Sequence, residues 1–196
     1  MSHPKTLASI LVLLATASCA PRDRTPLRIV DLIRELPSAE ARPTRAAFEV
    51  IDFPGPGRAY PAIRTLAPSR LVYTLPMPRR GVLTARILID ASEGGPPPQP
   101  LRFRIGISDD RIYETISDVV LTPGVQAEWV ALRADLSAYA GWKWSIFYRP
   151  DRVRWRLILG TDAATGIPAR GVWGVPAIES DRAAAREYVE RAARGR

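Results

Sequence analysis

The chain has 196 residues, 46% of them hydrophobic and 24% charged, which is the composition of an ordinary globular domain with additional terminal segments. Its single His and single Cys, His3 and Cys19, both lie near the N-terminus, so the rest of the chain excludes Ser-His-Asp and Cys-His catalysis, histidine metal sites and disulfides. The formal net charge is +8, but the basic residues are dispersed and form neither an RNP nor a helix-turn-helix pattern, so we expect no nucleic-acid partner.

The N-terminus has the pattern of an export signal. An apolar run over residues 7–17 follows Lys5, and it is shorter than the roughly 20 residues that span a bilayer. Small residues then lead into Cys19, an arrangement that resembles a bacterial lipobox, in which the Cys thiol is lipidated. We therefore expect a signal peptide over 1–18 and a lipid anchor (diacylglycerol and palmitate) at Cys19. By the same resemblance, Ala20 favours the outer membrane, facing the periplasm. Ordinary cleavage after Ala17 is the alternative.

The segment after Cys19 predicts a tether and a short helix within residues 19–44. Residues 20–26 are polar and contain two prolines. Apolar residues over 27–36 recur near helical spacing, which predicts an amphipathic helix that ends before Pro37. Alternation over 48–53 predicts a strand, and the Pro-Gly repeats of 54–57 predict a turn.

From residue 70 onward the pattern is that of short strands separated by turns. We expect strands at 70–77, 81–90, 101–108, 113–121, 128–132, 144–148, 153–159 and 171–178. This spacing is typical of a β-sandwich or barrel, here placed over residues 45–180. The tail 181–196 is rich in Ala, Arg and Glu, and Ser180 or Asp181 precedes it as a cap, which predicts a C-terminal helix.

Three motifs between residues 129 and 178 resemble a known domain family. They read W-V-A-L-R-A-D-L-S-A-Y-A-G, W-R-L-I-L-G-T-D and G-V-W-G-V-P-A-I. They resemble the C-terminal half of galactose-binding-like jelly-roll domains, which occur as carbohydrate-binding modules and as accessory domains. The resemblance implies an all-β fold, an antiparallel two-sheet sandwich, over roughly residues 48–180. Strand parity predicts that four residues are buried in its core: Trp129, Trp155, Leu157 and Trp173.

The same family frequently holds a structural calcium ion between its first and last strands. By that resemblance, Glu49 or Asp52 with Glu179 or Asp181 would occupy comparable positions, and carboxylate oxygens suit calcium. We expect no other metal and no cofactor.

An aromatic segment interrupts the family pattern after Gly141. Residues 142–152 read W-K-W-S-I-F-Y-R-P-D-R. Aromatic rings stack on sugar faces, and Arg binds carboxylates in a forked geometry. The segment therefore supplies the candidate ligand-binding residues, at least two of whose rings we expect to be exposed: Trp142, Trp144, Phe147, Tyr148, Arg149 and Arg152. Alternatively, the segment is a hairpin whose alternating rings pack in the core.

The densest acidic cluster contains Asp109, Asp110, Glu114 and Asp118. Paired carboxylates hydrolyse glycosides when a cleft holds them at a fixed separation, but these acids also fit a solvated turn, and we assign no catalytic residue. The sequence thus favours a non-catalytic, lipid-anchored envelope protein whose sandwich binds carbohydrate. The alternative is an assembly lipoprotein that docks onto an envelope protein complex through its tail helix. A carboxylate-based glycosidase is third.

Overall fold

The computed structural model describes residues 25–55, 57–92, 94–109, 111–125, 128–140 and 155–194. The predicted signal peptide, Cys19, Asp110 and the aromatic segment 142–152 lie outside these residues.

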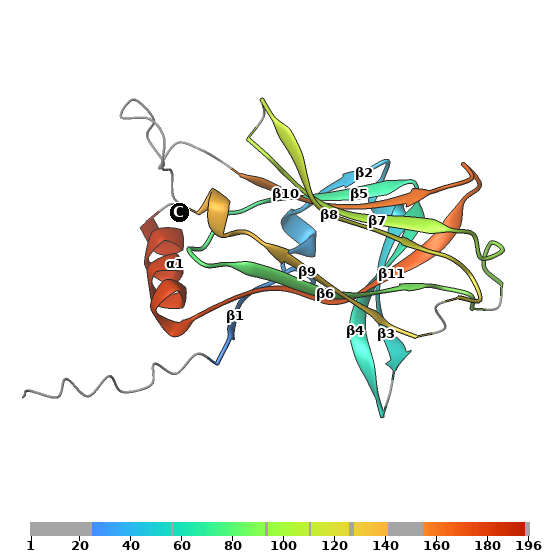
Figure 1. The fold of residues 1–196 in the computed structure, drawn as a ribbon, viewed down its shortest axis with the longest axis horizontal. Coiled ribbons are helices and arrows are strands. Elements are labelled where there is room, and N and C mark those ends of the chain that lie inside the picture. The colour runs from blue at the N-terminus through green and yellow to red at the C-terminus, as the bar shows by residue number, and fades with distance from the viewer. Residues whose placement is uncertain are drawn as a thin grey trace, which may run out of the picture.

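Two antiparallel sheets pack face to face and form a β-sandwich (Figure 1). The six-stranded sheet has the order β3 (Phe48–Gly55), β4 (Arg58–Ala67), β11 (Ala169–Ser180), β6 (Val82–Ile89) and β9 (Val130–Asp135), and β1 (Leu27–Asp31) pairs with the end of β11. The five-stranded sheet has the order β2 (Glu40–Arg42), β5 (Ser69–Thr74), β10 (Arg156–Ala163), β7 (Leu101–Ser108) and β8 (Tyr113–Leu121). The described residues also form the 3-10 turns η1 (Leu36–Ser38), η2 (Arg45–Ala47) and η3 (Ser137–Tyr139). The predicted antiparallel two-sheet fold is confirmed.

Alternation along the strands builds the core between the two sheets. In β7, Leu101, Phe103, Ile105 and Ile107 are buried, while the Arg residues between them point to the outer side. The Trp173 ring packs edge-on against Phe103, with 5.2 Å between ring centroids, and its Nε1 donates to the Thr161 hydroxyl at 2.9 Å. The predicted burial of Leu157 and Trp173 is confirmed, whereas Trp155 is only partly buried beside Tyr139.

The predicted helix over 27–36 is wrong. Residues 27–31 form β1, and a turn and η1 follow. The free edge of β11 offers backbone hydrogen bonds to this segment, and the β-branched Ile29 and Val30 favour an extended chain. Leu32 is then fully buried, and its carbonyl accepts a hydrogen bond from the Tyr73 hydroxyl.

Strand β4 was absent from the sequence prediction, which passed from the turn at 54–57 to a strand at 70. Two Arg residues and Pro61 interrupt its apolar alternation. The strand forms because it lies between β3 and β11 and hydrogen bonds to both. It carries Arg64 on the side that faces away from the core.

The predicted C-terminal helix is confirmed as α1 (Arg182–Arg194). The Asp181 carboxylate accepts the Ala184 N–H at 2.9 Å, which caps its first turn. Ala184 and Tyr188 are buried against the sandwich. In the part of the chain that the structure describes, no helix has both the length and the apolar character needed to cross a membrane.

Candidate functional site

The outer face of the six-stranded sheet, turned away from the other sheet, collects charged side chains near one end of the sandwich. Ile63 and Trp173 point into the core, so alternation places Arg64 on β4 and Val172 on β11 on the outer face. Glu49 on β3 lies opposite Arg64, which lies opposite Val172. The β3–β4 hairpin and the distant strand β11 therefore bring their outer residues into one row.

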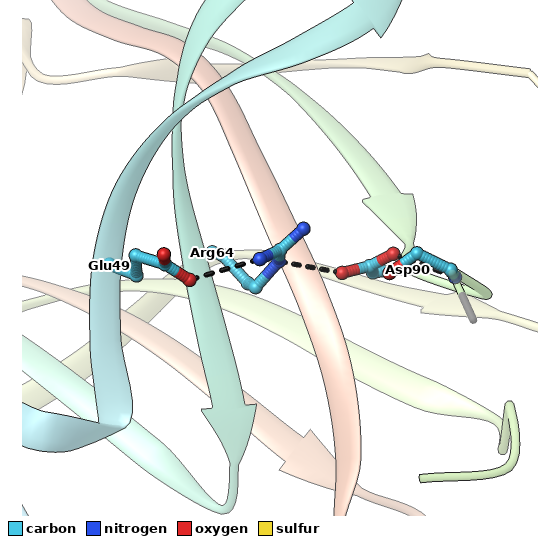
Figure 2. A network of polar contacts seen from close by, with 4 residues as sticks. Glu49, Arg64 and Asp90 are labelled. Atoms are coloured by element: carbon cyan, nitrogen blue, oxygen red, sulfur yellow. Dashed lines mark hydrogen bonds and ion pairs between the residues drawn. The ribbon is translucent and has the colours of Figure 1, made fainter. Parts of the chain in front are cut away.

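Arg64 is held between two carboxylates (Figure 2). Its Nε donates to Asp90 Oδ2 at 2.7 Å, and its Nη1 donates to Glu49 Oε2 at 2.9 Å. The Asp90 side chain is fully buried and also accepts the Ser92 N–H at 2.9 Å, while the Glu49 side chain is 62% exposed. The guanidinium is thus fixed in the plane of two charge-assisted bonds, and it keeps Nη2 for another partner.

An open hollow of about 380 Å³ lies over this network. We call it the Arg64 groove, and its lining residues are 46–49, 64–66, Pro96, Pro168 and Arg170. One side of the groove is formed by η2. This turn is held in place because the Arg45 guanidinium donates to the carbonyls of Leu36 and Ala39. Ala and Pro side chains make the rim apolar, and the charged groups lie on the sheet.

Arg170 supplies a second guanidinium to the groove. Its side chain is partly buried, and a Cβ on Gly95 would lie 2.8 Å from its Nη1, so the loop backbone lies close to the guanidinium. Its backbone carbonyl accepts the Asp90 N–H at 2.9 Å, which fixes the strand beneath it. Among the described residues, no carboxylate forms an ion pair with Arg170.

An aromatic cluster of Phe53, Tyr60 and Trp129 lies further along the same face, toward the β3–β4 turn and outside the residues that line the groove. The Trp129 ring lies edge-on to Phe53 at 5.5 Å and to Tyr60 at 6.0 Å between centroids, and its Nε1 donates to the Pro54 carbonyl at 3.2 Å. The indole lies over Gly174, where a Cβ would come within 2.6 Å of it. Gly174 is two residues beyond Val172 on the same face, so the indole lies about 7 Å along the strand from the Arg64 row.

The prediction that Trp129 is a core residue is therefore wrong. Val130, Leu132 and Ala134 are the β9 residues that pack against the inter-sheet core. Trp129 has the opposite parity, and it projects from the outer face, partly exposed. Among the described residues, Trp129 shares this face with the rings of Phe53 and Tyr60.

The structure does not bring the four predicted calcium ligands together. Glu49 binds Arg64, and Asp181 caps α1 and pairs with Arg80 at 2.8 Å. The row of Glu49 meets β11 at Val172, seven residues before Glu179, which is a separation of about 23 Å along the strand. Asp52 is exposed on β3. Within the described residues, no three His, Cys, Asp or Glu side chains gather closely enough to hold a metal ion.

The described members of the acidic cluster have individual structural roles. Asp109 accepts the N–H groups of Arg111 and Ile112, which lowers the pKa of its carboxyl. Asp118 pairs with Arg102 at 3.5 Å, and burial together with the Glu114 carboxylate raises the pKa of the Tyr139 hydroxyl. These acids serve turn, strand and ring contacts. The binding candidates Trp142, Trp144, Phe147, Tyr148, Arg149 and Arg152 lie outside the described residues, so that hypothesis stays a prediction.

Sequence reasoning missed Arg64, Asp90 and Arg170. No local motif joins them, because the pairing of β11 with β4 on one side and with β6 on the other brings them together. The available signal was the pair of charges Arg64 and Asp90 next to apolar strand residues, since a charge at such a position usually has a partner.

A scan against protein-family models finds no match, and a search of curated proteins finds none either. Among solved structures, the chain is similar to TmCBM61 in complex with beta-1,4-galactotriose, with 10% identity, coverage of 79% of this chain and 99% of that chain, and a TM-score of 0.49. It is similar to CBM51 from Clostridium perfringens GH95 in complex with methyl-galactose, with 14% identity, coverage of 72% and 92%, and a TM-score of 0.46.

A third similar structure is the M60 catalytic domain with the CBM51-1 and CBM51-2 domains from Clostridium perfringens ZmpB, with 13% identity, coverage of 69% of this chain and a TM-score of 0.42. The chain spans only 12% of that structure, and 28% of a related one with the CBM51-2 and INT domains. All these neighbours contain carbohydrate-binding modules, the class that the sequence motifs resemble.

Proposed function

We propose that this protein is a non-catalytic carbohydrate-binding protein of the bacterial envelope and that the Arg64 groove is its binding site. The observation that carries the proposal is a guanidinium fixed by two carboxylates at the floor of an open hollow, whose apolar lining includes the side chain of Phe48. Sugars present hydroxyls around an apolar ring face, and such a surface offers partners for both.

Each group of the groove has a role in this proposal. The exposed Glu49 carboxylate accepts a sugar hydroxyl, and Arg64 Nη2 donates to another. Because Asp90 and Glu49 already hold the guanidinium, little side-chain entropy is lost when the sugar binds. Phe48 and the prolines of the rim contact the C–H face of a sugar, and Trp129 extends this apolar surface along the sheet.

The test is binding of the purified full chain to a glycan array, followed by calorimetry with the best ligand. Arg64→Gln removes the fixed guanidinium, so we expect affinity to fall about tenfold or more. Arg70→Gln is the matched control, because Arg70 is an exposed Arg on the five-stranded sheet. Equal affinity of the Arg64→Gln variant and the wild type would contradict the proposal, provided that both have the same circular dichroism spectrum.

The envelope location in this proposal depends on lipidation of Cys19. Replacing Cys19 by Ser removes the thiol that would carry the diacylglycerol, so the protein should move from the membrane fraction to the soluble periplasmic fraction. Fractionation followed by immunoblotting measures this. Unchanged membrane attachment of the Ser variant would contradict lipidation at Cys19. It would not bear on glycan binding by the groove, which the glycan array tests separately.

A further inference from the structure

We infer that the Arg64 groove selects acidic glycans and that Arg170 binds the carboxylate of a sugar acid. This inference rests on the proposed carbohydrate binding and names the ligand class of the same site. It starts from the charges of the groove. Asp90 is buried and binds Arg64, and Glu49 also binds Arg64. Arg170 is the guanidinium of the groove for which the described residues provide no carboxylate.

The loop after β6 lies close against the Arg170 guanidinium. Gly95 has no side chain where a Cβ would meet Nη1 at 2.8 Å, so the loop after β6 can lie directly against the charged head. Pro96 and Pro168 line the same hollow and restrict the backbone on either side. A partly buried cation without an anion is poorly compensated, and a planar carboxylate matches two of its N–H groups at once.

The two Arg residues are close enough for a single sugar unit to contact both at the same time. Arg64 lies opposite Val172, and Arg170 is two residues before Val172, so the two side chains are diagonal neighbours on one face, about 7–8 Å apart at their bases. A ring carboxylate on Arg170 then leaves the ring hydroxyls near Arg64 and Glu49. Glu49 repels a carboxylate at the opposite end, which fixes the orientation of the ligand.

The experiment compares acidic oligosaccharides with their methyl esters, which keep the sugar backbone and remove the charge. The probes are oligomers of galacturonate, glucuronate and mannuronate, each in both forms, with a sulfated oligosaccharide as a second kind of anion. Calorimetry with the full chain should give binding of at least one uronate that is about tenfold or more weaker for its ester. Stronger binding of the sulfated probe than of every uronate would overturn carboxylate selection.

Two variants assign the effect to Arg170. Arg170→Gln should reduce affinity for the acid about tenfold and remove the difference between acid and ester. Gly95→Ala keeps every charge but displaces the guanidinium, and should reduce the preference for the acid in the same direction. Arg70→Gln is again the control. If the circular dichroism spectrum shows that one of these two variants is misfolded, the affinities of the other variant decide the assignment to Arg170.

The outcomes separate this inference from the proposed function. Equal binding of acids and esters, or binding of neutral glycans alone that Arg64→Gln abolishes, overturns acid selection and keeps carbohydrate binding. An acid preference that survives both Arg170→Gln and Gly95→Ala also overturns the assignment to Arg170. Absence of binding to every glycan in the array and the panel overturns both.

Discussion

Asp90 shows how one buried carboxylate organises a surface site. Its side chain has no exposed area, yet it accepts two hydrogen bonds, from Arg64 Nε and from the Ser92 N–H. An ionised group at such a depth is tolerated when its bonds replace those of water. The bond from Arg64 fixes the position of its guanidinium at the floor of the groove. Binding geometry at the surface therefore depends on a residue that no ligand touches.

We expect Asp90→Ala to lower the free energy of unfolding by about 2–3 kcal/mol, because it leaves Arg64 without its buried partner. Glu49→Ala is the comparison, since its carboxylate is largely exposed to water, and it should lower the free energy by less than about 1 kcal/mol. Urea unfolding measures both. Equal losses for the two variants would show that burial of Asp90 does not govern the network.

The elements of the six-stranded sheet are connected over its outer face by Trp129. The residue precedes β9, and its indole contacts side chains of β3 and β4 while it lies over Gly174 of β11. Gly174 is needed at this point because any side chain would occupy the space of the ring. This contact joins the two edges of the sheet over its outer face.

Gly174→Ala should therefore lower the free energy of unfolding by about 1–3 kcal/mol, as the added methyl group displaces the indole. Gly160→Ala is the matched control within a strand, because its Cβ would meet Arg104 atoms no closer than 3.8 Å. We expect that variant to be neutral, or more stable by up to about 1 kcal/mol. Denaturant unfolding followed by tryptophan fluorescence compares them. A tolerated Gly174→Ala would contradict the role given to Trp129.

Strands bounded by turn residues could be predicted from the sequence, and strands that depend on distant partners could not. The ranges of β7 and β8 agree with the predicted 101–108 and 113–121, because turn residues such as Pro100, Asp109 and Pro123 lie at their ends. In β1, the apolar spacing near 3.6 residues indicated a helix, but the segment forms a strand because it pairs with β11. In β4, Arg58, Pro61 and Arg64 concealed the alternation.

At the scale of the whole molecule, the candidate site lies where segments far apart in sequence meet at one end of the sandwich. The segments 46–49, 64–66, 95–96 and 168–170 reach it from four connections or strands. Sequence motifs identified the class of fold, since they lie within single strands and turns. They did not identify the groove, because strand register and loop packing create it.

The stability of the whole molecule should decrease at alkaline pH. Burial raises the pKa of the Tyr73 hydroxyl, and burial with the nearby Glu114 carboxylate raises the pKa of Tyr139 to about 12. Tyrosines of the unfolded chain titrate near pH 10, so the unfolded state loses these protons first. Stability is therefore fully present below about pH 10 and is lost as pH rises through 12. Thermal unfolding between pH 9 and 12 measures this, and Tyr139→Phe should reduce the slope. A constant Tm over that range would contradict the expectation.

Carbohydrate binding at the Arg64 groove can be located by a nuclear magnetic resonance titration of the isotope-labelled full chain with its best array ligand. We expect the largest amide and guanidinium shifts at residues 46–49, Arg64, Gly95 and Arg170, with smaller shifts at Trp129. The aromatic segment 142–152 provides the internal comparison, because the sequence predicted its rings as the binding surface. Shifts confined to 142–152, with the signals of Arg64 and Arg170 unchanged at saturation, would contradict the assignment of the groove as the binding site.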